Sequence, residues 1–282
     1  MDYKNGYSIK PKYVTSVGEV IFTDGTNDVR ANQVTCEDYG YTFNASTGTC
    51  TSFRYNTKIN LTSNNAHNII KGTLNTTNVG TENSFLLGVS NTSKGNNQNI
   101  LITGAKNEIE NSLNNSSIIG GTFAQAQNQG EVVIGGGGFQ EALGLGLSQQ
   151  SFIQQSNKTI DATETALLTQ YLPLTYIQKV ANSVIGFEAN VIGVNYGGEG
   201  DIGDYGYVQI TGAVTFTNGL ASTYHQTTTH IVAAGQSGMN ITASMKDVTA
   251  TSFGVHVTGL AETRIQWTAS VKLWQNKLQI TF

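Results

Sequence analysis

A glycine repeat in the middle of the chain constrains its fold more than any other feature of the sequence. The glycines follow one another at a constant step of sixteen residues, at Gly72, Gly88, Gly104, Gly120 and Gly136. An aliphatic residue stands two places before each of them, at Ile70, Leu86, Ile102, Ile118 and Ile134. Asparagine follows the first three glycines by three places, at Asn75, Asn91 and Asn107. Each repeat combines a short apolar strand, a glycine corner and a polar stretch, which is typical of a β-solenoid turn.

A turn of sixteen residues is short. At about 3.3 Å per residue it has room for two short strands and two corners, and for almost no interior. Glycine and asparagine tolerate the left-handed backbone region at corners, and stacked asparagines can hydrogen-bond along the ladder. We expect one apolar side to stay uncovered in a single chain and to be buried around a threefold axis. The expected trimer core is Ile70, Leu86, Ile102, Ile118 and Ile134, and the five glycines form the turns of the shaft.

Residues 57–138 resemble the left-handed β-roll of trimeric autotransporter adhesin heads, whose repeats have the form Ser-Ile-x-Ile-Gly and also occur in phage tail-fibre shafts. The resemblance implies an obligate homotrimer. It departs from the pattern in the last two turns, where Gly120-Gly121 and residues 135–138, four glycines in a row, replace the asparagine-rich stretch. We therefore expect the roll to end, and the chain to change direction, near residue 138.

The composition supports an all-β protein and excludes several functions. Charged residues make up 12% of the chain, against about a quarter in an ordinary domain, while glycine occurs 32 times and proline twice. The net charge of −4 offers no basic face for nucleic acid, and no apolar run is long enough to cross a bilayer. The chain begins without the apolar core of a signal peptide, so we expect synthesis in a host cytoplasm, with no nucleic-acid partner and no membrane insertion.

The segment before the repeats, residues 1–56, contains an alternating run at residues 19–23 followed by a turn, which predicts a strand. The phrase Ile-Phe-Thr-Asp-Gly-Thr, followed by Cys-Glu-x-Tyr-Gly-Tyr, resembles the N-terminal part of short phage fibres. The resemblance implies an anchor to other virion proteins. A cap on the first turn of the roll is the alternative.

After a glycine-rich linker at residues 139–150, period-two alternation predicts a β-sandwich or jelly-roll domain at residues 151–282. The expected strands cover residues 166–172, 174–180, 183–194, 205–210, 253–257 and 265–273. The phrase Ile-Gly-Phe-Glu-Ala-x-Val-Ile-Gly-Val and a late Trp-Thr-Ala-Ser-Val resemble a C-terminal domain common on phage tail and fibre proteins. That resemblance implies no catalytic function.

The two cysteines, Cys36 and Cys50, are the only candidates for a covalent crosslink. They are either two partly buried thiols in a hairpin or a disulfide formed after release from the host. A metal site would need more ligands than this pair provides.

We find no constellation that points to catalysis, a metal ion or a cofactor. The four histidines lie far apart or on opposite strand faces, and the acidic turn at Asp201 and Asp204 resembles a Ca²⁺ loop only loosely. Glycoside cleavage needs two facing carboxylates. The acids of the roll are Glu82, Glu108, Glu110 and Glu131, and no two share a repeat phase in adjacent turns. We expect a protein that is not an enzyme.

The sequence therefore predicts an exposed virion protein, a phage tail or head fibre. A β-roll shaft would carry three copies of a C-terminal domain to a glycan or protein on the host surface. A purely structural decoration or adaptor is the alternative, and a polysaccharide depolymerase is less favoured.

Overall fold

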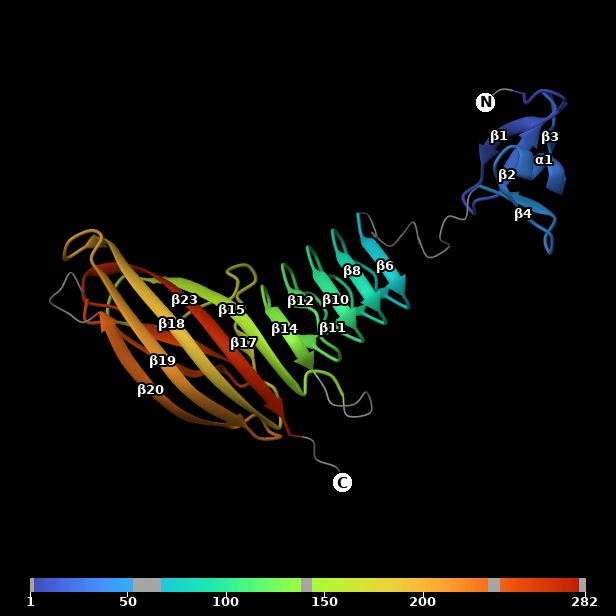
Figure 1. Cartoon of the computed structure of the whole chain (residues 1–282). Helices are drawn as coiled ribbons and strands as arrows, with labels where there is room; N and C mark the ends of the chain where they lie inside the picture. The colour runs from blue at the N-terminus through green and yellow to red at the C-terminus, as the bar shows by residue number, and fades with distance from the viewer. Residues whose placement is uncertain (1–2, 53–66, 138–143, 233–238, 279–282) are drawn as a thin grey trace. The chain divides into compact units, whose positions relative to one another are not determined.

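The computed structural model describes residues 3–52, 67–137, 144–232 and 239–278. About 57% of the chain is strand and 2% is helix, so the all-β expectation is confirmed (Figure 1). The chain divides into two compact units, Met1–Ser63 and Asn64–Phe282, which are described separately. The finer division of the second unit at residues 138 and 150 stays a prediction.

The N-terminal unit is a small sheet covered by one short helix and a hairpin. The sheet has the order β1-β2-β3, the helix α1 begins after Asn32, whose side chain accepts a hydrogen bond from the Thr35 amide, and β4 pairs with β5. The bounds are Lys10–Val14 for β1, Val20–Thr23 for β2, Asp28–Val29 for β3, Gln33–Asp38 for α1, Thr42–Asn44 for β4 and Thr49–Thr51 for β5. The strand expected at residues 19–23 is confirmed as β2.

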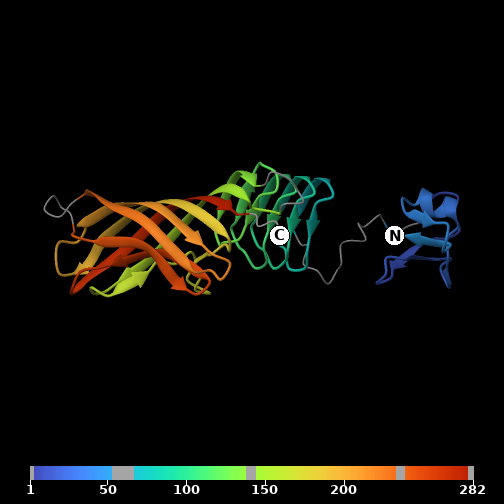
Figure 2. The same cartoon turned by 90° about the horizontal axis from the view of Figure 1, so that it is seen from below.

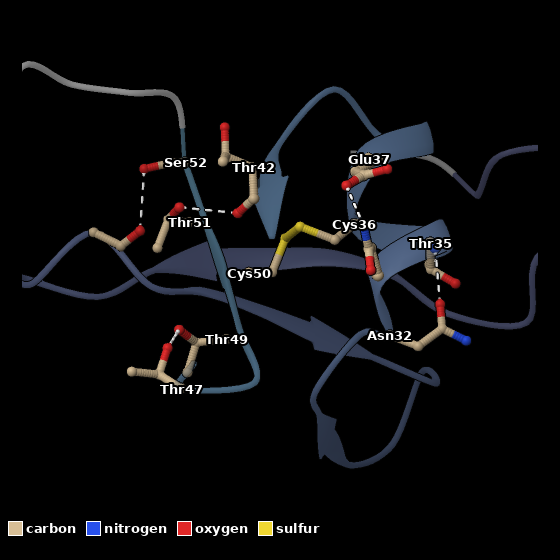
Figure 3. Close-up of a disulfide and its surroundings, with 12 residues drawn as sticks. Asn32, Thr35, Cys36, Glu37, Thr42, Thr47, Thr49, Cys50, Thr51 and Ser52 are labelled. Atoms are coloured by element: carbon tan, nitrogen blue, oxygen red, sulfur yellow. Dashed lines mark hydrogen bonds between the residues drawn. A yellow bond between two sulfur atoms is a disulfide. The ribbon is translucent and has the colours of Figure 1, made fainter. Parts of the chain in front are cut away.

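A disulfide joins Cys36 of α1 to Cys50 of β5 (Figure 3). Both cysteines are buried with Val20 and Phe22, and the Phe22 ring meets the rings of Tyr39 and Tyr41 edge-on. Of the two alternatives left by the sequence, the structure has the crosslink. It holds the helix against the hairpin in a unit too small to build a large core.

The repeats form a β-solenoid of about four turns. Its long strands stack in parallel in the order β14-β12-β10-β8-β6 (Figure 1), and the stacked turns are also seen in Figure 2. Its short strands stack in the order β13-β11-β9-β7. The long strands are β6 (Ile69–Thr73), β8 (Phe85–Val89), β10 (Leu101–Ala105), β12 (Ser117–Ile119) and β14 (Val132–Gly137). The short ones are β7 (Thr76–Thr77), β9 (Thr92–Ser93), β11 (Glu108–Ile109) and β13 (Gln125–Ala126).

Glycine is required where adjacent turns touch. A Cβ on Gly72 would lie 1.9 Å from the carbonyl oxygen of Gly88, and one on Gly88 would lie 1.9 Å from that of Gly104. All three have φ between +103° and +123°, which side chains rarely adopt. Beyond them the spacing drifts, because Gly121 rather than Gly120 stacks on Gly104.

The last expected turn glycine, Gly136, also departs from the repeat. A Cβ on Gly121 would lie 2.6 Å from the carbonyl carbon of Gly135 and 2.9 Å from the Gly136 nitrogen, so Gly135 and Gly136 share the last corner. Gly136 also lies at the junction with the next strand, where a Cβ on it would lie 2.9 Å from the carbonyl oxygen of Ser148 in β15. The expected reversal of the chain is found here, since β15 returns antiparallel to β14.

An asparagine ladder runs along one corner of the roll, as the repeat predicts. The Oδ1 of Asn75 accepts a hydrogen bond from the Asn91 amide at 2.9 Å, and the Oδ1 of Asn91 accepts one from the Asn107 amide at 3.1 Å. Each Nδ2 donates to corner carbonyls, as Asn91 does to Leu87 and Gly104. The ladder satisfies backbone groups that the tight turns leave without a strand partner.

Beyond the roll the same sheet continues into long antiparallel strands. It reads β20-β19-β18-β23-β15-β14 and then follows the roll, so ten strands form one sheet (Figure 1). The added strands are β15 (Ser148–Thr159), β18 (Ser183–Gly198), β19 (Tyr205–Phe216), β20 (Ser222–Val232) and β23 (Thr263–Lys277).

A second sheet packs against these long strands. It has the order β16-β22-β17, with β21 beside β22. Its strands are β16 (Glu164–Ala166), β17 (Ile177–Gln178), β21 (Thr242–Thr249) and β22 (Ser252–Thr258). The core between the two sheets centres on Trp267, Phe187, Phe216 and Phe253, all at most 2% exposed. Trp267 lies on the buried face of β23, where buried and exposed residues alternate.

Four of the six strands expected after residue 150 are confirmed, as β18, β19, β22 and β23. The pair expected at residues 166–172 and 174–180 is wrong. Only the short β16 and β17 form there, and Gln170 and Thr175 make an isolated bridge on either side of Pro173. Proline has no amide hydrogen to donate, so it interrupts the ladder.

In the described part of the chain, no helix has the length and hydrophobicity to cross a membrane.

Candidate functional site: an outer apolar face and its surroundings

The long strands of the roll have one face turned into the solenoid and one turned outward. Side chains alternate between these faces along each strand. The outward apolar side chains align in two columns across neighbouring strands. One column holds Ile69, Phe85, Leu101 and Val132, with Ser117 between the last two. The other holds Leu87, Ile119 and Ile134, with Lys71 and Thr103 on either side of Leu87. We call the seven apolar residues the outer apolar face. Ile69 and Phe85 of the first column and Ile119 and Ile134 of the second remain 42–48% exposed, which is unusual for apolar residues of their size gathered on one face.

The residues expected at a threefold axis lie elsewhere. Leu86, Ile102 and Ile118 are fully buried inside the single chain, in a cluster with Ile100 and Ile109. They therefore cannot contact another copy. The turn has a larger interior than its sixteen residues suggested, because the short strands and the corners complete a core that one chain fills alone.

The two outer members of the expected set are placed differently. Ile70 is in the inward column with Leu86 but stays 42% exposed, since no turn precedes it among the described residues. Ile134 points outward beside Ile119, and Val133 takes the inward place beside Ile118, because the last step is fifteen residues and not sixteen.

The outer apolar face continues onto the next two strands of the same sheet. Val132 of β14 is opposite Phe152 of β15, and Phe152 is opposite Lys272 of β23. The Lys272 Nζ lies 5.8 Å from the centre of the Phe152 ring and 4.7 Å from that of Trp274, which is 41% exposed. The flexible, charged side chain thus lies between two aromatic rings where the roll meets the long strands.

Two carboxylates meet on the short-strand side of the roll. Glu108 and Glu110 alternate with Ile109 on one side of the chain, and Lys94 Nζ lies 2.9 Å from the first and 3.0 Å from the second. Gln125 Nε2 also donates to both. The hydrogen bond to Glu108 raises the pKa of Lys94 against the opposing effect of burial. The two acids lie two positions apart within a single turn, whereas the sequence prediction concerned acids at the same repeat position in adjacent turns.

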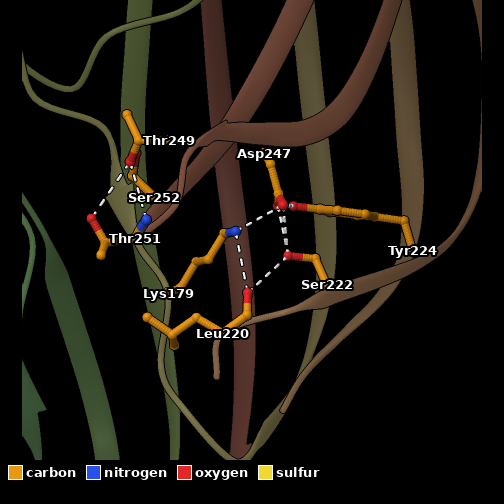
Figure 4. A network of polar contacts seen from close by, with 8 residues as sticks. All are labelled: Lys179, Leu220, Ser222, Tyr224, Asp247, Thr249, Thr251 and Ser252. Atoms are coloured by element: carbon orange, nitrogen blue, oxygen red, sulfur yellow. Dashed lines mark hydrogen bonds and ion pairs between the residues drawn. The ribbon is translucent and has the colours of Figure 1, made fainter. Parts of the chain in front are cut away.

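A polar cluster ties β21 to the edge strand β20 (Figure 4). Asp247 accepts hydrogen bonds from Tyr224 Oη at 2.6 Å and Ser222 Oγ at 2.7 Å, and pairs with Lys179 Nζ at 2.8 Å. Burial alone would raise the pKa of Asp247, but these donors outweigh it and lower the pKa. The Lys179 side chain is 2% exposed, and its Nζ also donates to the Leu220 carbonyl. The cluster therefore stabilises the packing of these segments against one another.

A fully buried carboxylate sits where the roll ends. Glu131 Oε2 accepts hydrogen bonds from the amides of Gln127 and Asn128 at 2.8 and 2.9 Å. Asn128 Oδ1 in turn accepts from the Gln178 amide in β17, so this node links the last turn to the second sheet. Desolvation raises the pKa of Glu131 in spite of these donors.

The acidic turn and the histidines form no common site. Asn195 Nδ2 donates to the carbonyls of Glu199 and Asp201, and the Asp204 carboxylate accepts from the Asp201 amide, so the turn is held by its own hydrogen bonds. His256 is half-buried in β22, and burial lowers its pKa. Within the described ranges no three His, Cys, Asp or Glu side chains gather as metal ligands would.

No family model matches the chain, and no curated protein does. Among solved structures it is similar to tailspike protein gp49 from Acinetobacter baumannii bacteriophage Fri1, a capsular polysaccharide depolymerase, at 8% identity and a TM-score of 0.30, over 71% of this chain and 48% of that one.

Two further tailspikes are similar at lower scores. The tailspike of Acinetobacter baumannii phage AM24 has 7% identity and a TM-score of 0.25 over 76% of this chain and 50% of that one. The tailspike of Acinetobacter phage vB_ApiP_P1 has 8% identity and a TM-score of 0.21 over 72% and 45%. The chain spans about half the length of these tailspikes. Because the identities and TM-scores are this low, the function is argued from the chain's own residues.

One expectation is contradicted. The sequence predicted a protein that is not an enzyme, whereas the first of the similar structures is described as a depolymerase. The absence of enzymatic activity is therefore withdrawn as a conclusion.

Proposed function

We propose that the chain is a fibre protein of a phage particle, in which three copies associate through the outer apolar face and present their C-terminal parts to the host surface. The observation that carries the proposal is the alignment of Ile69, Phe85 and Leu101, with their partners, in columns along the outside of the roll. A monomer in water would leave this ordered apolar surface exposed.

The outer apolar face suits association of like copies. Its members repeat at the rise of the solenoid, so a second roll alongside the first meets the same spacing of side chains. Covering what remains exposed of Phe85, Ile119 or Ile134 contributes roughly 1 kcal/mol each, and the gain accumulates along the roll. Three copies around one axis, the arrangement of the rolls that the repeat resembles, close this interface without leaving an unpaired face.

The N-terminal unit fits attachment to other virion proteins. It carries its own small core and a disulfide, which persists in the oxidising surroundings of a released particle. Large apolar side chains also remain on its surface, with Val17 at 83% and Val34 at 64% exposed. Such side chains are available to a partner.

The C-terminal strands fit contact with a host glycan or protein. Three copies held side by side add their weak contacts, so attachment gains avidity without a strong single site. The test is binding of the labelled full chain to host cells, with Phe85→Asp as the variant. Loss of both trimer and cell binding supports the proposal, whereas cell binding by a monomeric Phe85→Asp variant contradicts the role of the trimer.

A structural decoration or adaptor is the alternative to host attachment. It predicts particles that lack this chain but adsorb to the host at the normal rate. Adsorption reduced severalfold in a deletion phage, and restored by the purified chain supplied during assembly, supports attachment.

Polysaccharide cleavage is a second candidate function, favoured by the meeting of Glu108 and Glu110. Paired carboxylates are what glycoside cleavage needs, one as acid and one as base or nucleophile. The test is release of reducing ends from host capsular polysaccharide. Activity that Glu110→Gln abolishes would assign cleavage to the pair, and activity unchanged in Glu108→Gln and Glu110→Gln would exclude it.

A further inference from the structure

We propose that the groove beside the C-terminal half of β15 binds a saccharide that carries a carboxylate, a proposal that rests on the host-attachment role and gives it a site. A cavity of about 480 Å³ opens there, within the range of ligand pockets. Three segments distant in sequence line it. They are Ser156, Asn157 and Lys158 of β15, Leu168, Gln170 and Tyr171 after β16, and Gln266 and Trp267 of β23.

The pairing of β15 with β23 builds the groove. Lys158 is directly opposite Gln266, and Ser156 is bridged on its other side to Leu168. Asn157 Nδ2 donates to the Ala166 carbonyl at 2.8 Å, which fixes the segment that leads to Tyr171. The wall is therefore set by backbone pairing on both sides of β15 and is formed before a ligand arrives.

The polar groups at the groove are free to bind. Within the described chain, the Gln266 amide, the Ser156 hydroxyl and the Tyr171 hydroxyl have no hydrogen-bond partner, although many polar side chains nearby do. Amides and hydroxyls that can both donate and accept match the hydroxyl groups of a sugar. Tyr171 is 70% exposed at the rim and offers an aromatic face for the apolar side of a sugar ring.

Charge selects an acidic sugar over a neutral one. No carboxylate lines the cavity, and Lys158 makes no ion pair with any described residue; its Nζ lies 5.3 Å from the centre of the Tyr196 ring. An ammonium group without a counter-charge favours an anionic group on the ligand, and its hydrogen bonds to a carboxylate are stronger than those to a hydroxyl.

A second hollow lies on the other side of Lys158. It is lined by Ile160, Tyr196, Gly198, Glu262 and Arg264, and its Tyr196 ring is the one whose centre lies 5.3 Å from the Lys158 Nζ. Arg264 and Gln266 are two places apart on β23 and are both exposed on the same face. Tyr171, Lys158 and its strand partner Gln266 line the groove, and Tyr196 and Glu262 line the second hollow, so together they suit an oligosaccharide.

The test uses the full chain on an oligosaccharide array that pairs neutral oligomers with uronate-containing ones. We expect binding to the uronate-containing members. Lys158→Gln should weaken that binding at least about tenfold while leaving any neutral binding unchanged, and Tyr171→Ala should weaken both. Gln154→Ala, which alters an exposed residue on the same face of β15 outside the groove, is the matched control and should bind as the unaltered chain does.

Two results would overturn the proposal. One is an array with no bound oligosaccharide, and the other is equal binding by the Lys158→Gln, Tyr171→Ala and Gln154→Ala variants with unchanged circular dichroism. Binding of the same preparation to host cells is measured in parallel. Cell binding with an empty array would leave host attachment standing and remove only the saccharide groove, whereas loss of both would remove the two together.

Discussion

Leu101 and Ile102 are neighbours in β10 that face opposite sides of the roll. Ile102 is fully buried between Leu86 and Ile118, while Leu101 points outward beside Phe85. Leu101→Asp should therefore separate the copies and leave the secondary structure intact. Ile102→Asp buries a charge inside one chain, which costs several kcal/mol, and should unfold the roll. Circular dichroism and sedimentation distinguish the two outcomes.

The control for this pair is Thr76→Asp, which places the same charge on the short-strand side, where Thr76 is exposed. It should change neither fold nor assembly. If Leu101→Asp stayed associated, or if Ile102→Asp remained folded while the copies dissociated, the assignment of the inner and outer faces would be reversed.

The asparagine ladder should contribute to stability at its buried members. Asn91→Ala removes the donor to the Gly104 carbonyl and the acceptor of the Asn107 amide in a fully buried corner. Each buried group left without a partner costs about 1–3 kcal/mol, so the free energy of unfolding should fall by at least that amount. Asn78→Ala, at an exposed position whose side chain donates to the Lys94 carbonyl, should change it by less than about 0.5 kcal/mol. Denaturant unfolding measures both, and equal effects would show that the ladder is dispensable.

Reduction should destabilise the N-terminal unit alone. The Cys36–Cys50 disulfide closes a loop of 14 residues, for which chain entropy gives about 3 kcal/mol. In the Cys36→Ser/Cys50→Ser variant, the thermal transition of that unit should occur at a lower temperature than in the unaltered chain. The transition of residues 64–282 should stay at the same temperature. Differential scanning calorimetry separates the two transitions. If a reducing agent lowered the transition temperature of the double variant as much as that of the unaltered chain, the result would argue against the disulfide.

The buried Glu131 should make the second unit less stable at high pH. Its pKa is raised by burial, so the folded state holds this proton more firmly than the unfolded state, whose pKa lies near 4.5. The associated stability is present below that value and is lost as the pH rises through the folded pKa. Glu131→Gln keeps an acceptor oxygen without the charge, so it should raise the Tm by a few degrees at pH 8 and little at pH 4. A Tm that falls at pH 8 would contradict this account, and Glu262→Gln, at an exposed acid, serves as control.

The repeat predicts the solenoid but cannot tell which side chains face inward. Apolar residues stand in adjacent pairs, such as Ile69-Ile70, Phe85-Leu86 and Leu101-Ile102, so both faces of each strand are apolar and the pattern fits either phase. The last turn shifts the register again, because an extra glycine at Gly121 and a shorter polar stretch before Val132 cancel out only in part. Neither the extra glycine nor the shorter stretch can be recognised from the spacing of single residues in the sequence.

The candidate groove depends on pairing that no local pattern reveals. Lys158 and Gln266 are more than a hundred residues apart and meet only because β15 and β23 are neighbours in one sheet. The segment that carries Tyr171 is short and irregular where alternation predicted a strand. Alternation did identify β18, β19, β22 and β23, since each buries one face in the core.

The mass of the purified chain in solution tests the central claim most directly. Sedimentation equilibrium should give three times the 30.1 kDa of one chain, with a sheet-rich circular dichroism spectrum. A folded species of 30.1 kDa that persists as the protein concentration rises would show that the monomer is stable with its outer apolar face exposed to water. That result would contradict the account.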